Sequence, residues 1–172
     1  MLSADEVVHA LYRDPAIIRR VRERFGPDVL TVGGEVDRRA LSGHAFAADD
    51  GMAFLEGLLH PRIARARREW IARVAASDPP PPLMVCEVPM LFEAGLADAF
   101  DAVVVVTAPE GVRRARVAGR GQDFDLRSRR QQDEDAKVAA ADMAFVNDGS
   151  PDALDQWVGS VMARYAVADG TP

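Results

Sequence analysis

The chain is 172 residues long and carries 27 acidic against 21 basic side chains, a formal net charge of −6. This length suits one globular domain, and a hydrophobic content of 48% can fill one sizeable core. The negative balance argues against a nucleic-acid binder held by a basic surface. The single cysteine, Cys86, excludes an internal disulfide, and no apolar run approaches a membrane span, so we expect a cytoplasmic protein.

Helical signals dominate the first 76 residues. Apolar residues at helical spacing follow Asp5, and Pro15 is placed to start a second helix. Asp37 is placed to cap a third. Pro61 is expected to interrupt the long tract that follows and to leave a bend just before it.

Short apolar runs mark the second half, and they alternate with helical segments. The runs lack polar alternation, as expected for parallel strands that are covered on both faces. This order predicts right-handed βαβ units in a three-layer α/β domain, with a helical lobe at 15–76 inserted between two strands. The expected strands are 83–88, 102–106 and 143–146, and the expected helices begin near 109, 123 and 151.

Two segments after strands could carry chemistry. Residues 87–93 leave a buried strand at its carboxyl end, where open α/β sheets bind ligands, although a plain strand-to-helix turn explains them equally well. Arginines gather between 113 and 130, where they could clamp a polyphosphate. A solvated helix face explains Arg113 and Arg114 better, which leaves Arg120, flanked by two glycines, as the stronger candidate.

Asp5 and His60 are ambiguous when taken alone. An acidic residue in a first helical turn complements the helix dipole, and a histidine before a proline is commonly packed at a bend. Arginine must make almost all cationic contacts, because Lys137 is the only lysine.

A series of motifs resembles the dephospho-coenzyme A kinase family in order and spacing, from the first residues to about Tyr165. Only the segment between Arg120 and Gln131 is shorter than in that family. The motifs are Ala4-Asp5, Asp37-Arg38-Arg39-x-Leu41, Leu55-Glu56-x-x-Leu59-His60-Pro61, Val88-Pro89-Met90-Leu91-Phe92-Glu93, Arg116-x-x-x-Arg120, Arg127-x-x-x-Gln131, Lys137, Ala141-Asp142 and Asn147-x-Gly149.

The resemblance implies a P-loop kinase-like parallel sheet in a single domain, 1–172, with the substrate lobe at 15–76 and a lid at 120–131. The family uses ATP and Mg²⁺ to phosphorylate the ribose 3′-hydroxyl of dephospho-coenzyme A, the last step of coenzyme A synthesis. By this resemblance Asp5 orients or deprotonates the acceptor hydroxyl, and Arg120 reaches the transferring phosphates. The implied binding residues are His60, Pro89, Met90 and Leu91 for the acceptor, and Arg120, Arg127 and Asn147 for the nucleotide.

One family signature does not occur in the sequence: the G-x-x-x-x-G-K-[ST] loop that holds phosphates and magnesium. Gly33-Gly34 is not a disguised copy, because Glu35, Val36 and Asp37 follow it. The opening residues align with the family's second strand, with Ser3 in place of its usual first aspartate. One strand-loop-helix unit of roughly 30 residues is therefore missing.

Loss of a central strand should leave unpaired strand edges. We therefore expect a mis-assigned start codon, a fragment, or a strand supplied by a partner chain, with self-association through the exposed edges. Three functions stay open: a dephospho-coenzyme A kinase that is inactive as the chain stands, a non-catalytic protein that binds a coenzyme A ligand, and another small nucleotide kinase. The His60-Pro61 and 88–93 motifs argue against the last.

Overall fold

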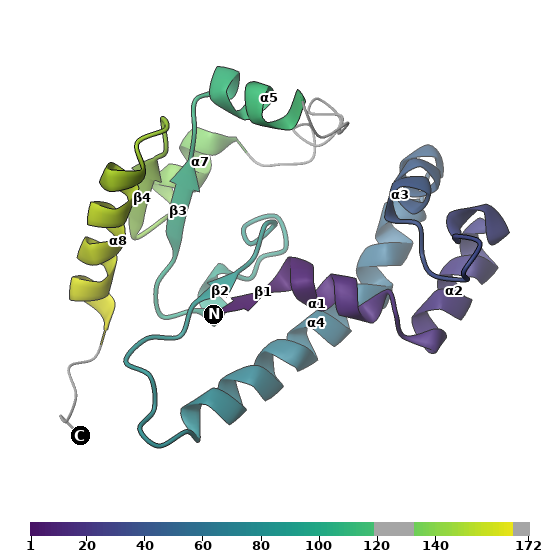
Figure 1. The fold of residues 1–172 in the computed structure, drawn as a ribbon, viewed down its shortest axis with the longest axis horizontal. Helices are drawn as coiled ribbons and strands as arrows, with labels where there is room; N and C mark the ends of the chain where they lie inside the picture. Colours follow the sequence, from purple (N-terminus) through teal and green to yellow (C-terminus); the bar gives the residue numbers. More distant parts are fainter. Residues whose placement is uncertain (119–132, 167–172) are drawn as a thin grey trace. The chain divides into compact units, whose positions relative to one another are not determined.

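The structure, a computed structural model, describes residues 1–118 and 133–166. It divides into two compact units, Met1–Pro89 and Met90–Pro172, and each is treated by itself below (Figure 1). No helix within the described residues is long and apolar enough to cross a membrane.

The first unit combines one pair of strands with a group of helices. Its strands are parallel, with Leu2 opposite Cys86 and Ser3 opposite Glu87. The first strand continues directly into the first helix, so the helix begins at the strand's carboxyl end. The elements are β1 (Leu2–Ser3), α1 (Ala4–Leu11), α2 (Pro15–Phe25), the 3-10 turn η1 (Pro27–Val29), α3 (Arg38–Ala47), α4 (Gly51–Ala75) and β2 (Cys86–Glu87).

Side-chain caps explain where the helices of this unit begin. Asp14 accepts a hydrogen bond from the backbone N–H of Ala16 at 2.7 Å, with Pro15 as the first helical residue. Asp37 accepts from the N–H groups of Arg39 and Ala40 at 2.9 and 3.0 Å. The predicted starts of both helices are confirmed.

The bend predicted at Pro61 is wrong, because α4 runs through it as one helix. Proline removes the N–H that would bond to the carbonyl one turn earlier, a loss confined to one position. The carbonyl that lacks its helical donor is that of Gly57, and at the next position the Arg62 guanidinium Nη1 adds a bond to the Leu58 carbonyl at 2.6 Å. Leu58 and Leu59 are also buried in the core, and this packing holds the helix together across the proline.

The core of the first unit lies among α2, η1, α3 and α4. It consists of the aliphatic side chains Ile17, Val21, Val29, Leu41, Ala45, Leu55, Leu58 and Leu59. Two of these helices approach unusually closely: a Cβ added at the buried Gly51 would lie 2.5 Å from the carbonyl oxygen of Ala45. Only glycine fits this contact.

The second unit is built on a second parallel pair. The pairing runs in register from Val104 opposite Met143 to Thr107 opposite Val146. One face is covered where Phe145 stacks on Trp157, with ring centroids 5.4 Å apart. The elements are η2 (Ala97–Ala99), β3 (Val104–Thr107), α5 (Glu110–Ala118), α7 (Glu134–Ala139), β4 (Met143–Val146) and α8 (Pro151–Tyr165).

Coverage of these strands differs from the expectation. Strands covered on both faces were predicted, yet burial alternates along β3 and β4. Val104, Val106 and Val146 are 38%, 51% and 55% exposed. Among the described residues each sheet has only two strands, too few to bring helices over every position of both faces.

We predict that Gly51→Ala destabilises the first unit by about 1–3 kcal/mol, because the added methyl group overpacks the contact with Ala45. The matched control is Gly57→Ala on the same helix, where nothing lies within 4 Å and alanine is favoured over glycine by about 0.5–1 kcal/mol. Urea unfolding in a Trp157→Phe background, with Trp70 as the reporter, measures both. Equal stability of the two variants would contradict the prediction.

Candidate active site

Asp5 lies at the carboxyl end of a strand in the first unit. Because β1 passes straight into α1, its carboxylate occupies the first turn of that helix, on the edge where parallel sheets bind ligands. The side chain is 66% exposed and forms an ion pair with Arg38, whose Nη2 lies 3.4 Å from Oδ1. A carboxylate in this position is accessible to a ligand and has a cationic neighbour.

Arg38 also acts on Tyr12, the residue that caps the C-terminal end of α1. Burial raises the pKa of the Tyr12 phenol, and the positive charge of Arg38 opposes that shift. Arg38 is the first residue of α3, whose start is fixed by the Asp37 cap. The capped helix thus presents one guanidinium to both the Asp5 carboxylate and the surroundings of Tyr12.

The residues expected on the acceptor side fall in both units. In the first, His60 is exposed on α4 and is not packed at a bend, and Pro89 is also exposed. In the second, Met90 and Leu91 are half-buried in a turn whose backbone bonds run from Ala94 N to Met90 O and from Leu96 N to Leu91 O, both 3.0 Å.

Asn147 lies at the carboxyl edge of the β3–β4 pair. Its backbone N–H donates to the Thr107 carbonyl at 2.7 Å, which continues the parallel ladder by one residue. Its side-chain Oδ1 accepts from Arg116 Nη2 of α5 at 3.4 Å. Gly149, with φ +124°, then turns the chain toward α8. The residue predicted for the nucleotide side therefore has an arginine partner.

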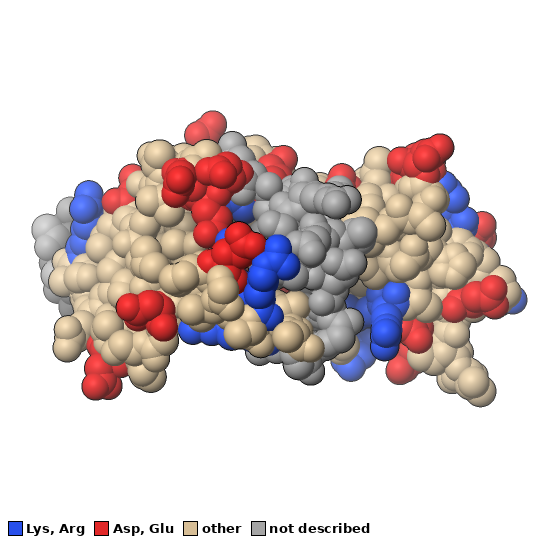
Figure 2. Space-filling view, turned by 90° about the horizontal axis from the view of Figure 1, so that it is seen from above, with Lys and Arg blue, Asp and Glu red and all other residues tan. Residues whose placement is uncertain are grey.

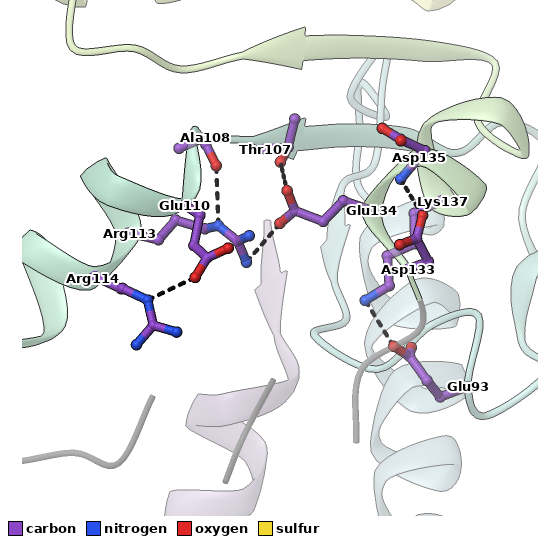
Figure 3. A network of polar contacts seen from close by, with 10 residues as sticks. All are labelled: Glu93, Thr107, Ala108, Glu110, Arg113, Arg114, Asp133, Glu134, Asp135 and Lys137. Carbon is purple, nitrogen blue, oxygen red and sulfur yellow. Dashed lines mark hydrogen bonds and ion pairs between the residues drawn. The ribbon is translucent and has the colours of Figure 1, made fainter. Parts of the chain in front are cut away.

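A polar network joins α5, α7 and the end of β3 (Figure 3). Glu134 accepts from the Thr107 hydroxyl at 2.8 Å through one oxygen and pairs with Arg113 Nη1 at 2.7 Å through the other. Arg113 Nε also donates to the Ala108 carbonyl at 3.0 Å. Arg113 is thus not on a solvated helix face, which is where the sequence placed it. Arg114 pairs with Glu110 on that exposed face.

A more deeply buried pair lies beside this network. The Lys137 ammonium of α7 is 2.7 Å from Glu93 Oε1, and both side chains are only 15% exposed (Figure 3). Glu93 and Lys137 both belong to the motifs that resemble the family, but the sequence did not predict that they pair. Their opposite charges were the available signal.

Arg120 and Arg127 lie outside the described residues, as does the predicted lid at 120–131. Within the described residues, no three His, Cys, Asp or Glu side chains come together as a metal site. On the face seen in Figure 2, acidic and basic side chains of the described residues are interspersed.

A family model for dephospho-CoA kinase matches residues 1–152. The chain belongs to the dephospho-CoA kinase family. The dephospho-CoA kinase of Anaeromyxobacter dehalogenans is 39% identical over 80% of this chain and 66% of its own length. That of Chlamydia pneumoniae is 37% identical over 91% and 79%. That of Mycobacterium tuberculosis is 38% identical over 77% of this chain but only 32% of its own length, so the chain spans less than two thirds of some relatives.

Two solved structures share the fold of this chain. TT1252 from Thermus thermophilus superposes with a TM-score of 0.73 at 28% identity, over 95% of this chain and 83% of that one. The dephospho-CoA kinase from Campylobacter jejuni gives 0.66 at 22% identity, over 96% and 84%, and supports the fold. The predicted family and the α/β, P-loop kinase-like fold class with parallel strands are confirmed.

We predict that Arg113 and Glu134 are energetically coupled, because their pair is half-buried and shared with Thr107. A double-mutant cycle with Arg113→Gln and Glu134→Gln should give about 0.5–3 kcal/mol. The exposed pair Arg20–Glu23 on α2 is the control and should give about 0.2–0.5 kcal/mol. Unfolding is followed by Trp157 fluorescence in a Trp70→Phe background for the first cycle and by Trp70 in a Trp157→Phe background for the second. Couplings of equal size would refute the prediction.

Proposed function

We propose that this chain provides the acceptor site of an ATP-dependent phosphotransferase that phosphorylates the ribose 3′-hydroxyl of dephospho-coenzyme A, the last step of coenzyme A synthesis. The observation that carries the proposal is Asp5, exposed at the carboxyl end of a parallel strand in a chain of this family. We assign the activity to the cytoplasm, where ATP is available and the single Cys86 is not required to form a disulfide.

Asp5 would act on the attacking group. In the reaction the 3′-oxygen forms a bond to the γ-phosphorus, the bond from that phosphorus to the β–γ bridging oxygen breaks, and the hydroxyl proton leaves. The Asp5 carboxylate orients the hydroxyl or accepts that proton. Arg38 places a positive charge beside this carboxylate, with Nη2 3.4 Å from Oδ1.

The remaining expected residues divide between the two ligands. We assign His60, Pro89, Met90 and Leu91 to the acceptor, and of these His60 belongs to the proposed substrate lobe at 15–76. We assign Asn147 to the neighbourhood of the adenine, with Arg116 as its partner. Arg120 and Arg127, in a lid at 120–131, would reach the phosphates, which suits the planar guanidinium.

The part of the site that would bind ATP, the phosphate donor, is incomplete in these 172 residues. They contain no G-x-x-x-x-G-K-[ST] loop. Lys137 is no substitute, because its ammonium is paired with Glu93. Asp5 is paired with a cation, and the described residues contain no group of three His, Cys, Asp or Glu side chains that could hold a metal ion, so they do not fit a Mg²⁺ site by themselves. We therefore propose that turnover requires a strand-P-loop-helix segment in addition to these residues.

A non-catalytic protein that binds a coenzyme A ligand is the second candidate. It is favoured by the contrast between the acceptor residues, which are all present with His60 and Pro89 exposed, and the ATP-binding loop, which does not occur in the sequence. We also propose self-association through the β3 edge of the second unit, because Val104 and Val106 leave apolar surface beside a strand that pairs only with β4 among the described residues.

We predict that the 172-residue chain binds dephospho-coenzyme A in calorimetry but shows no kinase turnover. The same chain, extended at its N-terminus by a strand-loop-helix segment with the G-x-x-x-x-G-K-[ST] pattern, should turn over ATP and dephospho-coenzyme A. It should also elute from size-exclusion columns as a smaller species. A Lys→Ala change in the added loop is the control. Binding without turnover in the extended chain favours the second candidate, and absence of binding in both contradicts the proposal.

In the extended chain, Asp5→Asn should lower kcat by about 10²–10⁴-fold, since the amide cannot accept the proton. Glu6→Gln is the matched control: Glu6 is in the same first turn and is exposed, and it should leave kcat unchanged. Steady-state kinetics with saturating ATP measure both. Equal loss in the two variants would remove Asp5 from the proposed mechanism.

A further inference from the structure

The only lysine of the chain is directed into the second unit. Lys137 Nζ lies 2.7 Å from Glu93 Oε1, and each side chain is 15% exposed. Attraction between charges that are shielded from water is screened far less than attraction at the surface. Such a pair keeps both side chains in place, so each partner constrains the position of the other.

The Glu93 end of this pair lies within a tight turn. The turn is closed by backbone bonds from Ala94 N to Met90 O and from Leu96 N to Leu91 O. Gly95, with φ +63°, adopts a conformation that other residues rarely accept. Because the turn is short and hydrogen-bonded, holding the Glu93 carboxylate also holds Met90 and Leu91.

The Lys137 end is held at the carboxyl edge of β3. Asp133 caps α7 by accepting from the N–H groups of Asp135 and Ala136 at 2.9 and 3.3 Å. Glu134, in the same turn, bonds to Thr107 at the end of the strand. Lys137 lies one helical turn further on, so its ammonium is positioned from the strand end.

We propose that Lys137 is a positioning residue: through Glu93 it holds the turn that carries Met90 and Leu91 in a set place relative to the end of β3. The role as an acceptor-positioning residue rests on the proposed function, in which Met90 and Leu91 line the acceptor side. A buried ion pair adds little net stability over an apolar contact of similar size. It is formed only when the two charged groups meet at hydrogen-bonding distance, which fixes the position of both side chains. That property suits the positioning of a substrate-binding turn.

The test is hydrogen exchange on the full chain, resolved to the amides of Ala94, Gly95 and Leu96. Lys137→Met should accelerate their exchange by about tenfold or more, because local opening of the turn becomes easier. The amide of Asn147, bonded to Thr107 across the parallel pair, should keep its rate. Lys137→Arg, which retains the charge, should restore slow exchange to within about threefold of the parent.

The matched control is Glu110→Gln, which breaks the exposed pair with Arg114 on α5 and should leave the turn unchanged. Unchanged exchange in Lys137→Met overturns the proposal. So does equal acceleration at Asn147, because it reports loss of structure throughout the unit. Failure of Lys137→Arg to restore slow exchange overturns it as well.

A second readout separates this proposal from the proposed function. By calorimetry with dephospho-coenzyme A, Lys137→Met should weaken binding about tenfold and Lys137→Arg should restore it. Absence of dephospho-coenzyme A binding in both the parent chain and the extended chain refutes the proposed function, and the exchange rates still decide whether Lys137 positions the turn. Accelerated exchange with unchanged affinity overturns the link to the acceptor.

Discussion

Parallel pairing of short strands is the constraint on which the candidate site depends. Parallel strands end at the same edge of a sheet, so pairing Thr107 with Val146 brings the residues that follow each strand together. Asn147 continues the ladder, and Glu134 reaches the strand end through the Thr107 hydroxyl. In the first unit the same rule applies to the β1–β2 pair, whose carboxyl edge carries Asp5. The chemistry of each unit follows from strand direction.

The ion pairs of the two units differ in how far water reaches them. Asp5 and Arg38 are 66% and 47% exposed, so solvent and ligands can compete for either partner. Glu134 and Arg113 are half-buried, and Lys137 and Glu93 are almost withdrawn from solvent. Exposed pairs can exchange partners when a ligand arrives, whereas buried pairs keep theirs. The pair in the first unit is therefore open to ligands, whereas the two pairs in the second unit hold their own side chains in place.

Features set by neighbouring residues were the ones that the sequence could predict. Asp14 and Asp37 cap the helices expected of them, and the predicted strand Met143–Val146 has the observed bounds. Features that depend on distant partners were not predictable. The continuity of α4 through Pro61 depends on packing, and the contact between Arg38 and Asp5 joins positions 33 residues apart. Motif order identified the family without revealing these pairings.

The length of α4 has a mechanical consequence. Its 25 residues span about 37 Å, and its first half is packed in the helical core. Its second half carries Arg67, whose positive charge partly opposes the rise in the pKa of Cys86 that burial causes. A stiff helix would pass a displacement of the core on along its length, toward Arg67. The backbone hydrogen bond missing at Pro61 makes that residue the most compliant point of the helix, so bending there would take up part of the displacement.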